Sequence, residues 1–262
     1  MNRRAWLEVL AAPLLCAVLV LAQDLDLPMQ PPKPFAGIAS GKHADPLPLS
    51  SPVEEKDPRD EPPPVFFGEE IGADGGAIVF VIDRSGSMSD PVRPYATGIG
   101  PGGQVVPLDP SIPAPPTRME AAKAELRRCI AALAPSFRFN LFAYDCTITQ
   151  WSAALQPADP APKASALAWL EGLQPGGATA TGPATAAALL QHPNCVSFVL
   201  LTDGAPNCPF GDRSEHRAMI RAANRQGATI AVFGIAAYGE FRGFCQAVAA
   251  DSGGPYYDVS VP

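Results

Sequence analysis

A carboxylate and two hydroxyls occur at every second position in the segment AIVFVIDRSGSM, residues 77 to 88. Asp83 ends an apolar run with the composition of a buried β-strand, and Ser85 and Ser87 follow it. Side chains at positions i, i+2 and i+4 of an extended segment point the same way, so we expect their oxygens to converge where the strand ends. Hard oxygen ligands of this kind suit Mg²⁺, which accepts few carboxylates and usually keeps several waters.

Two segments much further along the chain offer oxygen ligands of the same kind. The run VSFVLLTDGAPN, residues 196 to 207, is apolar up to an acidic residue, Asp203. The segment PGGATATG, residues 175 to 182, is a glycine-rich loop that carries Thr179 just before an alanine-rich stretch. With the first segment, they supply two carboxylates and three hydroxyls.

The three motifs together, DxSGSM, the glycine-rich threonine loop and LLTDG, resemble the von Willebrand factor type A (vWA) domain and its metal-ion-dependent adhesion site. The resemblance extends over about residues 74 to 260. It implies a bound divalent cation, Mg²⁺ with Mn²⁺ or Ca²⁺ as alternatives. The implied ligands are Asp83, Ser85, Ser87, Thr179 and Asp203.

The threonine loop departs from the family pattern, because many members have GGT where this chain has GGAT. Alignment on the double glycine would place Ala178 at the ligand position, whereas alignment on the following Thr-Gly places Thr179 there. We favour Thr179, because this alignment keeps the family's Thr-x-Thr-Gly run.

By the same resemblance, the two serines bind the metal directly, the two aspartates bind directly or through water, and one coordination position stays open. An Asp or Glu of a protein partner would fill that position. The resemblance therefore implies an exported protein-binding module for adhesion or assembly, and not an enzyme. Two alternatives stay open: a metal-dependent hydrolase that activates water at the same oxygens, and a structural domain that the metal only stabilises.

The histidines give the hydrolase little support. We expect His192 to be a surface or turn residue and His216 to lie on a solvated helix face, and the chain has no GxSxG motif. Cys208 is a candidate reactive thiol near the metal, but the sequence places no histidine to activate it.

Five cysteines follow the first 22 residues, and their spacings match no zinc site. The resemblance places Cys129 and Cys245 on neighbouring helices, where they either form a disulfide or remain buried free thiols. The full set is Cys129, Cys146, Cys195, Cys208 and Cys245, and the sequence leaves its pairing open.

From residue 75 onward, apolar strand patterns alternate with helical patterns. This predicts an α/β domain with a doubly wound, mainly parallel six-stranded sheet, one antiparallel edge strand and helices on both faces. Strands are expected at 77–82, 137–144, 147–151, 196–202, 228–235 and 256–259, and about six helices, including 118–133, 163–173, 181–191, 213–226 and 239–251. In such sheets ligands bind at the carboxyl ends of strands, which is where both aspartates are expected.

The rest of the chain predicts export. Two arginines precede an apolar run that ends at Ala22, which suits a signal peptide or signal anchor at residues 1–22. Residues 23–73 hold eleven prolines and are expected to form a disordered tether before a domain at 74–262.

We expect a location in the periplasm, at the cell surface or in the medium, with membrane contact only through an uncleaved N-terminal segment. A net charge of −7 without a basic stripe argues against nucleic acid as a partner. A Pro/Gly-rich insertion at 89–117 is expected either to border a partner-binding surface or to be a loop without function.

Overall fold

Continuous apolar runs form the centre of the sheet, because parallel strands covered on both faces have no solvent-facing side. The computed structural model describes residues 57–73, 75–92, 97–99, 105–107, 115–204 and 206–259. Every residue of β3 (Ala77–Asp83) and β9 (Ser197–Thr202) is buried. The expected signal segment, most of the tether and most of the insertion lie outside the described residues.

The main sheet has seven strands in the order β11-β10-β9-β3-β6-β7, with β8 also paired to β6. The strands from β11 (Tyr256–Val259) through β10 (Thr229–Ile235), β9 and β3 to β6 (Arg138–Tyr144) are parallel. Strands β7 (Ile148–Gln150) and β8 (Gln156–Pro157) are antiparallel to β6. The predicted six strands and antiparallel edge are confirmed, while the two-residue strand β8 is too short for its pattern to show in the sequence.

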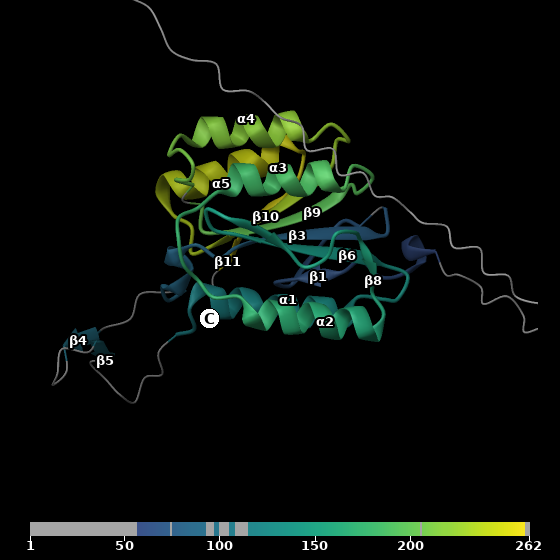
Figure 1. Ribbon diagram of the computed structural model, residues 1–262, viewed down its shortest axis with the longest axis horizontal. Helices are drawn as coiled ribbons and strands as arrows, with labels where there is room; N and C mark the ends of the chain where they lie inside the picture. Colours follow the sequence, from purple (N-terminus) through teal and green to yellow (C-terminus); the bar gives the residue numbers. More distant parts are fainter. Residues whose placement is uncertain are drawn as a thin grey trace, which may run out of the picture. The chain divides into compact units, whose positions relative to one another are not determined.

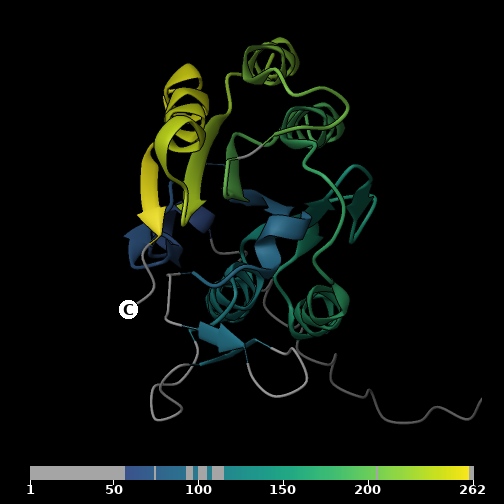
Figure 2. The same ribbon diagram turned by 90° about the vertical axis from the view of Figure 1, so that its left-hand side faces the viewer.

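Helices cover both faces of the sheet, as predicted (Figure 1). Helices α1 (Arg118–Ala132) and α2 (Pro160–Gly172) lie on one side, and α3 (Thr181–Gln191), α4 (Arg213–Ala223) and α5 (Gly239–Asp251) on the other. Figure 2 shows the same layers end on, with α4 outermost. The described residues hold these five α-helices, rather than about six, together with the 3-10 helices η1 (Pro58–Asp60) and η2 (Gly86–Ser89).

The helix boundaries follow local capping chemistry. Helix α1 begins with a capping box, in which Thr117 and Glu120 each bond the other's backbone N–H. Helix α2 begins at Pro160, three residues earlier than predicted, because proline suits the first turn of a helix. Among the described residues, no helix is long and apolar enough to cross a membrane.

The stretch 57–73, which the sequence assigned to the disordered tether, is part of the fold. Strands β1 (Val65–Phe66) and β2 (Glu69–Glu70) form a hairpin whose two turn residues, Phe67 and Gly68, both have positive φ. Such two-residue turns match the twist of paired strands. The boundary predicted at residue 74 is therefore wrong for these residues.

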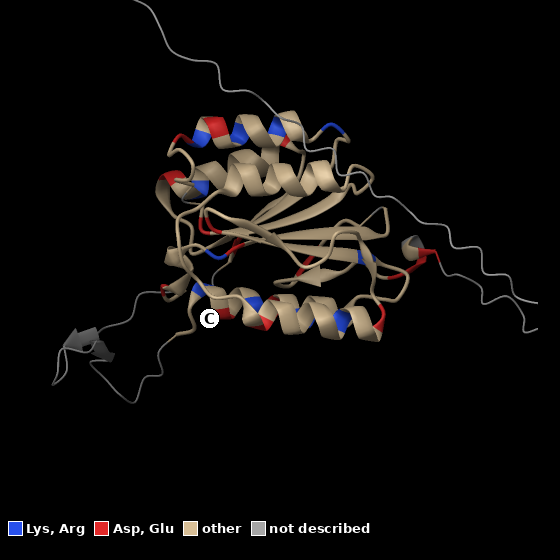
Figure 3. Ribbon diagram, in the orientation of Figure 1, with Lys and Arg blue, Asp and Glu red and all other residues tan. Residues whose placement is uncertain are grey.

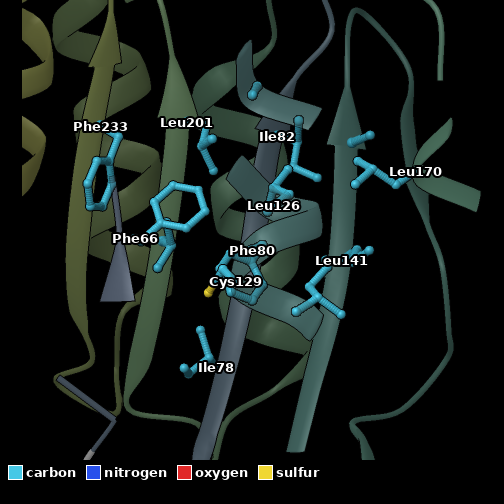
Figure 4. Packing of buried hydrophobic residues seen from close by; sticks show 14 of the residues in the cluster. Phe66, Ile78, Phe80, Ile82, Leu126, Cys129, Leu141, Leu170, Leu201 and Phe233 are labelled. Atoms are coloured by element: carbon cyan, nitrogen blue, oxygen red, sulfur yellow. The ribbon is translucent and has the colours of Figure 1, made fainter. Parts of the chain in front are cut away.

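The hairpin is held by one fully buried side chain. Phe66 packs edge-on against Phe233 at a ring-centroid distance of 4.8 Å and lies 5.8 Å from Phe80. Figure 4 shows Phe66 among Phe233, Leu201 and Phe80, in the cluster that also holds Leu126 and Cys129 of α1. The sequence did not reveal this packing, because Phe80 and Phe233 belong to other strands, β3 and β10.

The two ends of the insertion at 89–117 lie side by side. Pro91 and Thr117 form an antiparallel bridge, and Val92 N donates to Pro116 O at 3.0 Å. Within the insertion, β4 (Thr97–Ile99) pairs with β5 (Val105–Pro107). Because Arg118 N also donates to Asp90 O at 2.9 Å, the insertion begins and ends beside the first residue of α1.

Candidate metal centre

Asp83 is fully buried at the end of β3, and both of its oxygens accept hydrogen bonds. Oδ1 accepts from Ser85 N at 2.8 Å. Oδ2 accepts from Thr202 Oγ1 at 2.7 Å and lies 3.3 Å from the hydroxyl of Tyr144. The sheet register explains the contact with Thr202. Ile82 pairs with Leu201, so the next residues, Asp83 and Thr202, lie beside each other at the ends of adjacent strands.

Burial raises the pKa of Asp83 from 3.8 to about 6, and the nearby charge of Asp203 acts in the same direction. Hydrogen bonds from Ser85 and Thr202 oppose this change. Both carboxylates are nearly buried, so water screens the repulsion between them only weakly. A cation placed between them would favour their charged forms.

The serine loop continues from Asp83 with its hydroxyls side by side. Ser85 is 1% exposed, and its Oγ lies 3.2 Å from the Oγ of the half-buried Ser87. The fully buried Met88 anchors the loop in the core. The hydroxyls of Ser85 and Ser87 therefore lie together directly after Asp83, with Ser87 in the 3-10 helix η2 rather than in the extended segment that the sequence predicted.

The threonine loop is bound to the serine loop through backbone contacts. Gly86 N donates to Gly177 O at 2.9 Å, and Gly176 N donates to Arg84 O at 2.8 Å. Gly177 has a φ of +71°, and a Cβ there would lie 3.1 Å from Asp145 Cβ. Gly177 therefore permits the approach of the threonine loop to Asp145, and Gly86, whose Cβ would lie 3.3 Å from Gly177 O, permits its approach to the serine loop. Thr179 follows the double glycine at 2% exposure.

Thr179 is held by its backbone. Its N–H donates to Asn207 Oδ1 at 2.7 Å, and its carbonyl accepts from Asn207 N at 2.9 Å and Cys208 N at 3.1 Å. Asn207 lies four residues after Asp203, so the threonine loop is fastened to the loop that follows the distal aspartate.

Asp203 follows β9, is 3% exposed, and uses only one of its oxygens. Oδ2 pairs with Arg118 Nη1 at 2.7 Å, while the buried Oδ1 has no hydrogen-bond partner. Arg118 is the first residue of α1, and its Nε is also buried without a partner. Sequence analysis did not single out Arg118, whose only signal was its place directly after the insertion.

The residues therefore fit a hard divalent cation. The carboxylates of Asp83 and Asp203 are nearly buried, and Oδ1 of Asp203 is unpaired. The adjacent hydroxyls of Ser85 and Ser87 follow Asp83 directly, and Arg118 balances only part of the negative charge. In Figure 3 the central strands of the main sheet are tan along nearly their whole length, and most charged residues lie on helices and loops. Among the residues that the structure describes, no group of three or more His, Cys, Asp or Glu side chains is placed to hold a metal ion, so a cation here would depend on hydroxyl ligands beside the two carboxylates.

The expectation for His216 is wrong, and His192, which follows α3 directly before a turn, is buried rather than at the surface. His192 is 6% exposed, with Nε2 lying 3.0 Å from Asn140 Nδ2. His216 is fully buried: Nδ1 accepts from Gly182 N at 2.9 Å, and Nε2 lies 2.9 Å from Phe210 O. The bond from Gly182 joins α4 to the start of α3, and the contact with Phe210 joins α4 to the loop before it; helical periodicity reveals neither.

The cysteines settle one open alternative and correct one expectation. Cys129 and Cys245 are the buried free thiols of the second alternative rather than a disulfide, and Cys195 is also free and buried. Burial raises the pKa of Cys129 to about 12, as expected of a thiol that packs as an apolar side chain. Cys208 is bonded to Cys146 and is therefore not a free thiol near the site.

The described residues form a vWA fold. A von Willebrand factor type A protein from Catenulispora acidiphila is similar with a TM-score of 0.53 and 20% identity, over 71% of this chain and 39% of that one. The PilB minor pilin from Streptococcus sanguinis is similar with a TM-score of 0.51 and 16% identity, over 71% of this chain and 56% of that one. BatB from Bacteroides thetaiotaomicron is similar with a TM-score of 0.50 and 19% identity, over 71% of this chain and 91% of that one.

These similarities confirm the fold that the sequence motifs implied. No protein-family model and no curated protein matches the chain. The chain spans less than two thirds of the length of the Catenulispora and PilB chains.

Proposed function

We propose that this protein is an exported binding module that holds one divalent cation, Mg²⁺ by ligand type, and captures a protein partner through that cation. The metal is held by Asp83, Ser85, Ser87, Thr179 and Asp203. When bound, it supplies an electrophilic position that a partner's Asp or Glu fills. No step of catalysis is required.

The observation that carries this proposal is the unpaired Oδ1 of Asp203. A buried carboxylate oxygen without a partner is unfavourable by about 1–3 kcal/mol or more, and here it lies near a second buried carboxylate. A divalent cation would satisfy the oxygen and offset the repulsion between Asp83 and Asp203. The hydroxyls of the serine loop add neutral ligands without adding further negative charge.

Arg118 supports one competing function, a structural domain that needs no metal. Its guanidinium already pairs with Asp203 and leaves a single net negative charge on the Asp83, Asp203 and Arg118 group. In that case the domain would capture no partner through its strand ends, and divalent cations would leave its stability unchanged.

The test is partner capture from an envelope extract by the immobilised full chain, with and without chelator. The Asp83→Ala variant is the functional control, and Asp159→Ala is the matched surface control, because Asp159 is exposed and its side chain makes no capping bond. We expect proteins that are captured in Mg²⁺ and lost in chelator or with Asp83→Ala. The same captured proteins under all conditions would refute the proposal.

The location rests on two supports. The first 22 residues have the composition of a signal peptide or anchor, and one protein of similar fold is a minor pilin. Detection of the protein in the cytoplasmic fraction of its own cells would contradict export.

A further inference from the structure

One disulfide joins two loops on either side of the threonine loop. Cys146 lies in the turn between β6 and β7, and Cys208 lies in the loop after β9, 62 residues later. Their Cα atoms are 5.7 Å apart. The bond therefore fixes the distance between the carboxyl-end loops of two strands that do not pair with each other.

Both loops hold the same dipeptide of the threonine loop. On one side, Ala180 N donates to Asp145 O at 2.9 Å, one residue before Cys146. On the other side, Thr179 O accepts from Cys208 N at 3.1 Å and from Asn207 N at 2.9 Å, and Thr179 N donates to Asn207 Oδ1 at 2.7 Å. The disulfide thus links the two loops whose groups bond the backbone of Thr179 and Ala180. We call this arrangement the clamp, and its arms are the loop with Asp145 and Cys146 and the loop with Asn207 and Cys208.

We propose that the Cys146–Cys208 disulfide positions Thr179 as a metal ligand, so that the oxidation state of this pair sets the affinity of the site for a divalent cation. This inference rests on the proposed metal site. Without the crosslink, each arm keeps its backbone bonds but is free to separate from the other. The hydroxyl of Thr179 is then no longer held at a fixed place relative to the serine loop.

The pair is also the accessible one among the five cysteines of the domain. Cys146 is exposed and Cys208 is half-buried, whereas the other three sulfurs are buried free thiols. A dithiol reductant can therefore reach the bond. Its thiolate attacks one sulfur to form a mixed disulfide, and its second thiol then releases the protein cysteine. Two protein thiols form as the reductant becomes a disulfide, and reaction with an oxidising disulfide reverses the exchange.

The first experiment measures the clamp without any metal. Amide hydrogen exchange of the full chain is followed in chelator for the oxidised protein, the dithiol-reduced protein and the Cys146→Ser/Cys208→Ser double variant. Thr179 and Ala180 are direct reporters, because their own N–H groups donate to the two arms. We expect about tenfold faster exchange at these two amides in both forms without the disulfide, with the amides of β3 unchanged. Unchanged exchange at Thr179 and Ala180 would overturn the inference.

The second experiment measures Mn²⁺ affinity of the same three proteins by calorimetry. Loss of groups that orient a metal ligand typically weakens binding by about 10–100-fold, so we expect a Kd at least about tenfold higher without the disulfide. Reductant should have no effect on the double variant. Equal Mn²⁺ affinity in oxidised and reduced protein would refute the coupling, whereas no binding by any form would refute the metal site and leave the exchange result intact.

The Asn207→Ala variant covers the case in which the double variant does not fold. It keeps the disulfide and removes only the side-chain acceptor of Thr179 N. We expect faster exchange at Thr179 than at Ala180 and weaker Mn²⁺ binding. Unchanged Mn²⁺ affinity in this variant would overturn the claim that the position of Thr179 sets the affinity.

Discussion

In the absence of metal, replacing Asp83 with asparagine should stabilise the protein at neutral pH, although it removes a proposed metal ligand. The reason is that Asp83 is fully buried, and that burial and Asp203 raise its pKa from 3.8 to about 6. A carboxylate in this position is unfavourable unless a cation is present, whereas an amide of nearly the same shape carries no charge.

The magnitude follows from linkage between proton binding and folding. A pKa raised by 6 − 3.8 = 2.2 corresponds to about 3 kcal/mol at about 1.4 kcal/mol for each unit. Because the folded-state pKa is the higher one, the stability from Asp83 is fully present below pH 3.8 and is lost as the pH rises through 6. The amide of the Asp83→Asn variant would be a poorer acceptor for Ser85 N or Thr202 Oγ1, a loss of about 1 kcal/mol, which leaves a gain of about 2 kcal/mol at pH 7.5.

The assay is urea unfolding of wild type and Asp83→Asn in chelator at pH 7.5 and pH 4.5. We expect the variant to be more stable at pH 7.5 and to lose that advantage at pH 4.5, where Asp83 of the wild type is protonated. The control is Asp159→Asn at an exposed position, expected to change stability by less than about 0.5 kcal/mol at either pH. A variant that is less stable than wild type at pH 7.5, or one whose difference does not depend on pH, would refute the electrostatic reasoning.

Three further predictions follow from other contacts. Arg118→Gln should tighten Mn²⁺ binding about tenfold or more in calorimetry, because it removes a positive charge beside Asp203. The control variant Arg127→Gln should have no effect, and equal or weaker binding by Arg118→Gln would contradict the prediction. Gly182→Ala should lower the melting temperature by several degrees, because its Cβ would lie 2.7 Å from His216 Cα; an unchanged melting temperature would show that the two helices separate easily. Phe66→Ala should destabilise the domain by about 3–5 kcal/mol in urea unfolding, and a loss below about 1 kcal/mol would mean that the hairpin is not part of the folded unit.

The sequence predicted the sheet well, because its apolar runs depend on neighbouring residues. The runs of β3 and β9 lead directly to Asp83 and Asp203, whereas the extended course expected for the serine loop is wrong at Ser87, which lies in the 3-10 helix η2. Parallel pairing then brought Asp83 level with Thr202, as expected when adjacent strands end at the same edge.

The features that the sequence did not predict depend on contacts between distant segments. His216 is buried because Gly182 N and Phe210 O meet its two ring nitrogens. Phe66 lies in the core because Phe80 and Phe233 surround it, although the adjoining prolines and charges resemble a tether. Neither set of partners leaves a periodic pattern in the chain.

The cysteine pairing and the role of Arg118 could not be predicted for a related reason. Cys146 and Cys208 follow different strands, and only the three-dimensional course of their loops brings them together. Arg118 reaches Asp203 across 85 residues, and its charge is indistinguishable in the sequence from that of a solvated helix residue.

The most direct test of the proposed metal centre is Mn²⁺ binding to the oxidised full chain, followed by paramagnetic resonance, for wild type and Asp83→Ala. We predict that wild type binds one Mn²⁺ per chain, that Mg²⁺ displaces it, and that Asp83→Ala binds none while remaining folded. Absence of Mn²⁺ binding to wild type, or equal binding by Asp83→Ala, would contradict a metal centre at the carboxyl ends of β3 and β9.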